Sequence, residues 1–180
     1  MVHEPRLLDF LVAKTPERFG GIVYRATRLG LAATTPSTAG GRWMPRDGMA
    51  VLYTSTESDG ALAEMSFHLG LLSPVPRKPI AVHRLQVAAK RMIRITRNDF
   101  DALEIDPNRF GELDYRRPEV VGDAIGFLEF DAMLVPSARW PCENLVLLQD
   151  NQDLSDSPVV IDSKEVAWID WAKSHGFVGS

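Results

Sequence analysis

The sequence predicts a single α+β domain in which small mixed sheets are flanked by helices. The chain has 180 residues, which is the length of one ordinary domain. Hydrophobic residues make up 45% of it and charged residues 24%, the balance of a protein with a buried core. The predicted elements come in the order strand, loop, strand, helix, and then mostly strands with two further helices. That order is typical of the α+β class.

The first 20 residues predict a helical arm that precedes the main domain at 21–180. Leucines at mixed helical spacing favour a short helix that breaks near Pro16. Residues 21–27 begin at a glycine pair and are rich in β-branched side chains, so they predict a strand. The segment 33–48 is rich in proline, glycine, serine and threonine, and it predicts a loop. Loops longer than about 12 residues in compact domains are usually either functional or disordered.

A strand and a helix are expected after this loop. Residues 49–54 form a short apolar run that suits a strand, and residues 59–69 place apolar side chains on one helical face. Hydroxyl side chains between positions 55 and 58 are the expected N-caps of that helix. Gly70 is placed to end it.

The second half of the chain predicts more strands than helices. Strands are expected at 80–87, 92–96, 133–135 and 145–148, and a helix at 119–130. A basic turn should join the first two of these strands, and Pro118 should break the chain before the helix. The last segment, 158–176, predicts a strand and a helix, with Asp162 and Glu165 as a capping pair and Gly176 as the stop.

Charge and composition exclude several classes of protein. The 20 basic residues are outnumbered by 24 acidic ones, and the formal net charge of −4 predicts no attraction to nucleic acid or anionic lipid. The first residues lack the apolar run of a secretion signal, and no stretch reaches the ~18 apolar residues of a membrane span. We therefore expect a cytoplasmic protein with no membrane contact and no direct binding of nucleic acid.

Residues that bind metals are sparse. Cys142 is the only cysteine, which excludes an intrachain disulfide and a cage of cysteine ligands. The four histidines lie at no spacing typical of metal ligands. We therefore expect no metal site.

Two charged residues in the first third are candidates for a functional site. Arg25 lies in a run of apolar and β-branched residues, where an unpaired guanidinium would be costly. It needs an anionic partner, which is either a protein carboxylate or the phosphate of a ligand. Glu64 lies one position off the apolar face of its predicted helix. That position suits either a solvated glutamate at the rim or a carboxylate at the edge of a cleft.

Six short strings occur together in one order along the chain. They are Val23-Tyr24-Arg25-Ala26, Gly40-Gly41-Arg42-Trp43, Val51-Leu52-Tyr53-Thr54-Ser55, Ala61-Leu62-Ala63-Glu64, Val135-Pro136-Ser137-Ala138 and Asn144-Leu145-Val146-Leu147. This set resembles the RES-domain family over residues 21–150, most of the chain. The family is named for an arginine, a glutamate and a serine, which here look like Arg25 or Arg42, Glu64 and Ser137.

The resemblance implies a function as well as a fold. RES proteins are toxins of bacterial toxin–antitoxin pairs, have a fold similar to that of ADP-ribosyltransferase toxins, and act on NAD⁺. On this basis the chain is expected to degrade NAD⁺ by phosphorolysis, with phosphate as co-substrate, or by hydrolysis, and to need no cofactor. The implied partner is a small helical DNA-binding antitoxin that covers the active site.

The resemblance also assigns roles to individual residues. Glu64 is expected to stabilise the cationic ribose that forms when the nicotinamide–ribose bond breaks. Arg25 and Arg42 suit the pyrophosphate of NAD⁺, because planar guanidiniums match phosphate oxygens. Tyr53 is expected to stack on nicotinamide, and Ser137 to bind the ribose or to orient Glu64. The remaining candidates for substrate binding are Tyr24, Trp43 and Asn144.

Two alternatives remain open at this point. The same site could transfer ADP-ribose to a host protein, because that reaction shares the cationic ribose and differs only in the acceptor. The fold could also serve as a binding module without catalysis, although the full set of polar residues argues against this.

Overall fold

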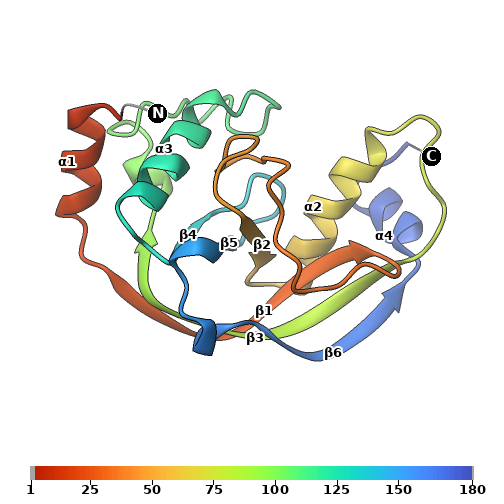
Figure 1. The fold of residues 1–180 in the computed structure, drawn as a ribbon. Helices are drawn as coiled ribbons and strands as arrows, with labels where there is room; N and C mark the ends of the chain where they lie inside the picture. The colour runs from red at the N-terminus through yellow and green to blue at the C-terminus, as the bar shows by residue number, and fades with distance from the viewer. Residues whose placement is uncertain (1–2, 180) are drawn as a thin grey trace.

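The secondary-structure elements combine a long curved sheet with helices at both of its ends (Figure 1). The computed structural model describes residues 3–179. Its α-helices are α1 (Pro5–Ala13), α2 (Ser58–Gly70), α3 (Arg116–Phe127) and α4 (Trp168–Ser174). Its strands are β1 (Glu17–Arg28), β2 (Val51–Ser55), β3 (Ile80–Arg94), β4 (Ala132–Pro136), β5 (Glu143–Leu148) and β6 (Val159–Val166), with short 3₁₀ turns at Arg97–Asp99, Gln149–Asn151 and Leu154–Asp156. The α+β prediction is confirmed.

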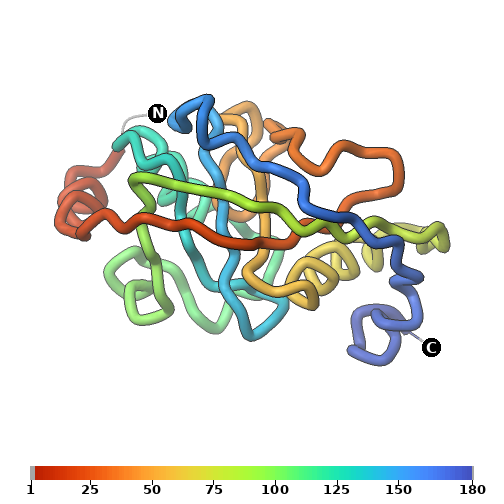
Figure 2. Tube along the Cα trace, turned by 90° about the horizontal axis from the view of Figure 1, so that it is seen from below, coloured from red at the N-terminus to blue at the C-terminus, as the bar shows by residue number. Residues whose placement is uncertain are grey.

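All six strands belong to one sheet in the order β1-β2-β5-β4-β3-β6, so the expectation of several small sheets was wrong. The sheet also closes on itself, because β1 pairs with β3 along its whole length and with β2 at Tyr24↔Ser55. Only the β3–β4 pairing is parallel among the pairings that the described residues form. Figure 2 shows β1, β3 and β6 side by side along the molecule. This closure brings the middle of β1 next to β2, where the site lies.

The strand β3 is continuous, which corrects the two strands and basic turn expected between 80 and 96. Residues 88–91, where the turn was expected, stay extended because β1 pairs with the first two of them, at Gly20↔Ala88 and Phe19↔Ala89. The carboxylate of Asp131 then accepts hydrogen bonds from the next two backbone N–H groups, those of residues 90 and 91, at 2.6 Å and 3.0 Å. Both partners are remote in sequence, so local composition could not reveal them.

The last helix is shorter than expected, and its predicted capping pair lies in strand β6. Asp162 accepts a hydrogen bond from Arg84 at 2.6 Å, and Glu165 lies opposite Ala81 of β3. Pairing with β3 therefore takes these residues, and α4 starts only at Trp168.

Two smaller expectations about helix ends were also wrong. Helix α2 has no side-chain cap, because Thr56 donates its hydroxyl to the carbonyl of Glu143 and the Ser55 hydroxyl lies 3.2 Å from the Cys142 sulfur. Pro118 lies inside the first turn of α3 rather than before it. Proline is tolerated there because the first N–H groups of a helix have no intrahelical acceptor.

Three groups of buried side chains hold these layers together. One group comes mainly from strands β1 to β5 and includes Val23, Leu52 and Leu85. A second packs α1 and α3 against β4 and β5, and a third packs α2 and α4 against β1 and β3. Because Leu7 and Leu11 of α1 are buried in the second group, the predicted N-terminal arm packs on the main core. The last residues of that arm, 17–20, belong to strand β1. Between residues 3 and 179 no helix has the length and apolarity needed to cross a bilayer.

Replacing Gly122 with alanine should lower the free energy of unfolding by about 1–3 kcal/mol, the usual cost of overpacking. Gly122 of α3 lies directly against the backbone of Trp43, and an added Cβ would overlap the Trp43 carbonyl oxygen. The helix or the loop must therefore move. Chemical denaturation measures the change. Gly20→Ala is the matched control, because a Cβ there meets no atom within 4 Å, and an equal loss in both variants would contradict the prediction.

Candidate active site

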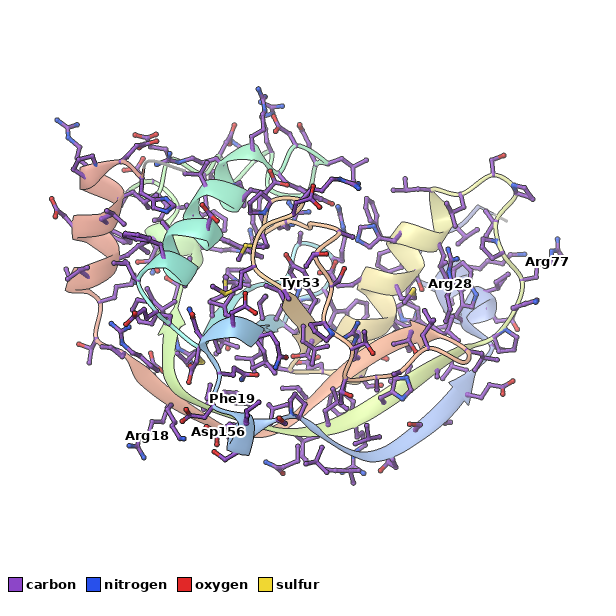
Figure 3. The ribbon with its side chains drawn as sticks, in the orientation of Figure 1. Arg18, Phe19, Arg28, Tyr53, Arg77 and Asp156 are labelled. Carbon is purple, nitrogen blue, oxygen red and sulfur yellow. The ribbon has the colours of Figure 1, made fainter. Side chains whose placement is uncertain are left out.

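A cleft of about 340 Å³ opens between β1, β2, α2 and the glycine-rich loop. Seven of the eight residues singled out from the sequence line it: Tyr24, Arg25, Arg42, Trp43, Tyr53, Glu64 and Asn144. The eighth, Ser137, reaches the cleft through a hydrogen bond to Glu64. Tyr53 stands centrally in the molecule, between α3 and α2 (Figure 3). The tertiary structure thus gathers residues from strands, a helix and two loops into one place.

Glu64 is held at the cleft by two hydrogen bonds to the same oxygen. Its Oε1 accepts one from the Ser137 hydroxyl at 2.8 Å and one from the Asn144 amide at 2.9 Å. The other oxygen, Oε2, receives no hydrogen bond from any residue between 3 and 179. Glu64 is partly exposed and borders the cleft, so the oxygen that the protein leaves without a hydrogen bond is available to a ligand there. The sequence left two positions open for Glu64, a solvated rim and the edge of a cleft, and the structure places it at the edge of the cleft.

Arg25 projects from β1 into the cleft and forms no ion pair. Its guanidinium donates to the carbonyl of Thr35 at 3.0 Å, and no ion pair among residues 3–179 includes it. Burial lowers the pKa of Arg25, as expected for a cation that has lost water without gaining a carboxylate. Of the two anionic partners that the sequence left open, the structure therefore favours a ligand.

Arg42 is a second cleft arginine that forms no ion pair with a carboxylate among the residues that the structure describes. Its guanidinium carbon lies 4.8 Å from the centre of the Phe110 ring and 4.4 Å from that of Tyr115. It also donates to the backbone carbonyls of Phe110 and Glu112. Burial lowers the pKa of Arg42, while the negative charge of Glu64 acts in the opposite direction. The two aromatic faces and two carbonyls fix the guanidinium plane, which a lysine could not reproduce.

Tyr53 explains the glycine pair of the loop. Its hydroxyl accepts a hydrogen bond from the backbone N–H of Trp43 at 3.2 Å, and burial raises the pKa of the phenol, so it stays protonated. A Cβ on Gly41 would come within 2.8 Å of that hydroxyl, and Gly40 has a φ of +82° that other residues rarely adopt. Gly41 therefore lets the loop lie directly on the tyrosine ring, and Gly40 allows the turn that brings the loop against the backbone of Arg46.

The two remaining aromatic candidates differ in how they meet the cleft. Trp43 borders it, but the residue is only 1% exposed and its indole packs in the core beneath α3. Its backbone, rather than its ring, therefore faces the site, and its proposed part in substrate binding remains a prediction. Tyr24 is partly buried on β1 and packs beside α2.

Comparison with known proteins decides the family. A family model described as the RES domain matches residues 22–169. The chain belongs to the RES-domain family.

Solved structures show the same fold. The crystal structure of the M. tuberculosis MbcT–MbcA toxin–antitoxin complex contains a chain that is 17% identical, with a TM-score of 0.79. The match covers 96% of this RES domain and 98% of that chain. No curated protein matches the sequence. The family resemblance seen in the six sequence strings is thereby confirmed, and the match extends past residue 150 to include β6.

The RES domain places two further residues at the cleft that the sequence analysis missed. His68 follows Glu64 by one helical turn and so faces the same side of α2, a spacing that could have revealed it. Desolvation lowers the pKa of His68, and the Glu64 carboxylate opposes that shift. Tyr115 lies just before α3 and packs on Arg42, and no sequence signal pointed to it.

The geometry limits the chemistry that this RES domain can perform with its own side chains. Within the described residues, one carboxylate that keeps an oxygen without a hydrogen bond lies in a cleft with a protonated phenol and two guanidiniums that form no ion pair. Across residues 3–179, no three His, Cys, Asp or Glu side chains come together as metal ligands would. The arrangement suits a substrate that carries phosphates and develops positive charge beside them.

Proposed function

We propose that this RES domain is a toxin that degrades NAD⁺ by breaking the bond between nicotinamide and ribose. The observation that carries the proposal is the combination, in one cleft, of a Glu64 oxygen without a hydrogen bond and two arginines without an ion pair, both among residues 3–179. NAD⁺ has the matching chemistry, because its pyrophosphate is dianionic and its nicotinamide ribose becomes cationic as the bond breaks.

Glu64 acts in this proposal on the cationic ribose. Departure of neutral nicotinamide leaves positive charge on the anomeric carbon and ring oxygen of the ribose. A carboxylate whose position is already fixed stabilises that charge without reorganising during the reaction. The hydrogen bonds from Ser137 and Asn144 to Oε1 supply that fixation and leave Oε2 available.

The arginines and Asn144 serve binding and orientation. Arg25 and Arg42 hold the pyrophosphate through charge-assisted hydrogen bonds. The side-chain oxygen of Asn144 is buried and has no hydrogen-bond partner in the described structure. A buried acceptor of this kind calls for a donor, and a ribose hydroxyl or the nicotinamide amide supplies one. Tyr53 provides an aromatic surface beside Glu64 for the nicotinamide ring.

The acceptor completes the reaction. Phosphate attacks the anomeric carbon to give ADP-ribose 1-phosphate, or water attacks and loses a proton to give ADP-ribose; nicotinamide is released in both cases. We also propose that an antitoxin, a small helical DNA-binding protein, covers the cleft until the toxin is released. The similar fold of a chain from a toxin–antitoxin complex supports such a partner.

Purified without a partner, the protein should consume NAD⁺ and release nicotinamide, and added phosphate should accelerate the reaction if phosphorolysis operates. Chromatography of the products separates ADP-ribose 1-phosphate from ADP-ribose, and labelled NAD⁺ with cell extract reveals transfer of ADP-ribose to protein. Addition of the product of the neighbouring gene should suppress the activity. NAD⁺ that remains intact for hours at micromolar protein, in all arms, would refute the proposal.

A further inference from the structure

The hydroxyl of Ser137 has its hydrogen-bonding capacity filled. It donates its one proton to Glu64, and it accepts hydrogen bonds from the backbone N–H groups of Arg139 at 3.1 Å and Trp140 at 3.3 Å. The direction of the serine proton toward Glu64 therefore depends on where the loop 137–142, between β4 and β5, places those two N–H groups.

The side chains of the same two residues anchor that loop on two different helices. The guanidinium of Arg139 lies 3.3 Å from the centre of the Phe67 ring, on the helix that carries Glu64. The ring of Trp140 lies 5.5 Å from that of Trp171 in helix α4. The loop is thus fixed to α2 through Arg139 and to the C-terminal helix through Trp140.

Four aromatic rings form this second anchor, which we call the aromatic clamp: Trp140, Trp171, His175 and Phe177. Trp171 is its centre, stacked on His175 at 4.2 Å and on Phe177 at 5.7 Å between ring centres. The backbone N–H of Phe177 donates to the carbonyl of Ala172 at 2.8 Å, which folds the end of the chain back on α4. Apart from Trp140, the clamp residues follow the stretch matched by the family model.

Helix α4 itself is firmly seated. Trp168 and Ala172 are fully buried against Leu62 and Leu69 of α2. The clamp therefore joins the Ser137 loop to the same helix that carries Glu64, by a route through α4. Trp171 and Phe177 also pack against this buried group, so the clamp is continuous with the core between α2 and α4.

We propose that Trp171 is a positioning residue for catalysis, which acts through Trp140 and Ser137 to hold the Glu64 carboxylate in its reactive orientation. This inference rests on the proposed function for its catalytic readout. Removing the ring frees Trp140, lets its N–H leave Ser137, and loosens the hydrogen bond to Glu64. Misplacement of a catalytic group by about 1 Å is enough to cost up to about 100-fold in rate.

The test compares Trp171→Ala and Trp171→Phe with the wild-type protein in NAD⁺ consumption. We expect kcat to fall about 10- to 100-fold in Trp171→Ala with KM for NAD⁺ unchanged, and to be largely retained in Trp171→Phe, which keeps an aromatic ring. In a Ser137→Ala background, Trp171→Ala should cause no further loss, because the effect passes through that serine. Phe127→Ala, an exposed aromatic residue on α3, is the control.

Hydrogen exchange gives a second readout that does not depend on any reaction. The amide protons of Arg139 and Trp140 should exchange faster in Trp171→Ala than in the wild type. If Trp171→Ala does not fold, Trp140→Leu and Trp140→Phe make the same comparison from the loop side.

The outcomes separate the two proposals. An unchanged kcat, or a full additional loss in the Ser137→Ala background, overturns the role of Trp171. If the wild type itself consumes no NAD⁺, the proposed function fails, and unchanged exchange of the two amides then overturns the clamp independently.

Discussion

Replacing Glu64 with glutamine should lower kcat for NAD⁺ consumption by about 10²–10³-fold, the usual effect of losing one electrostatic group that acts in the transition state. Glutamine has nearly the same shape, and its oxygen can still accept the hydrogen bonds that Ser137 and Asn144 donate to Oε1. The substitution therefore removes the charge and keeps the packing. We expect KM for NAD⁺ to change much less than kcat, because the charge matters mainly once the ribose becomes cationic.

Glu57→Gln is the matched control for this variant. Glu57 lies at the start of the same helix, is exposed, and is absent from the cleft lining. The same chemical change there should leave turnover unaltered. Steady-state kinetics together with thermal melting separates loss of catalysis from loss of folded protein. Wild-type turnover in Glu64→Gln would contradict the catalytic role and show that Glu64 is only a solvated residue at the rim of the helix.

Replacing Arg25 with glutamine should raise KM for NAD⁺ by about 10- to 100-fold, which corresponds to loss of a hydrogen bond to a charged group. Arg25 has no carboxylate partner to lose in the described part of the chain, since its hydrogen bond is to the Thr35 carbonyl. Its removal therefore leaves no unpaired protein charge behind. Because the pyrophosphate is bound alike before and during bond breakage, kcat should change less than KM.

Arg18→Gln provides the comparison on the same strand. Arg18 is exposed on β1, away from the cleft, as Figure 3 shows, so the charge of the protein changes equally in both variants. Initial rates over a range of NAD⁺ concentrations measure both constants. An equal rise of KM in the two variants would mean that general electrostatic attraction, and not a phosphate contact, accounts for the effect.

Several features of the fold could be predicted because their causes are local. The apolar runs at β2, β4 and β5 have the composition of buried strands, and α2 carries its apolar side chains at helical spacing. Gly70 lies at the end of α2, one residue within the helix rather than after it. Local patterns therefore identified most elements but placed their boundaries less accurately.

Errors arose where a remote partner overrode the local pattern. Residues 88–91 of β3 stay extended because β1 and the Asp131 carboxylate bind their backbone groups. Asp162 lies in a strand because it pairs with β3 and accepts a hydrogen bond from Arg84. Pairings of this kind join residues far apart in sequence, so they cannot be predicted from a short stretch of sequence.

The sequence by itself determined the family and the identity of the polar residues that gather at the site, since both depend on residue types in a fixed order. Only the tertiary structure decided what those residues touch. It placed a single pair of hydrogen bonds on one oxygen of Glu64, left Arg25 without a carboxylate, and brought His68 and Tyr115 to the same cleft. The physical reason is that the chemical role of a charge depends on its neighbours, its burial and its unpaired atoms, and these exist only once strands and helices distant in sequence have packed together.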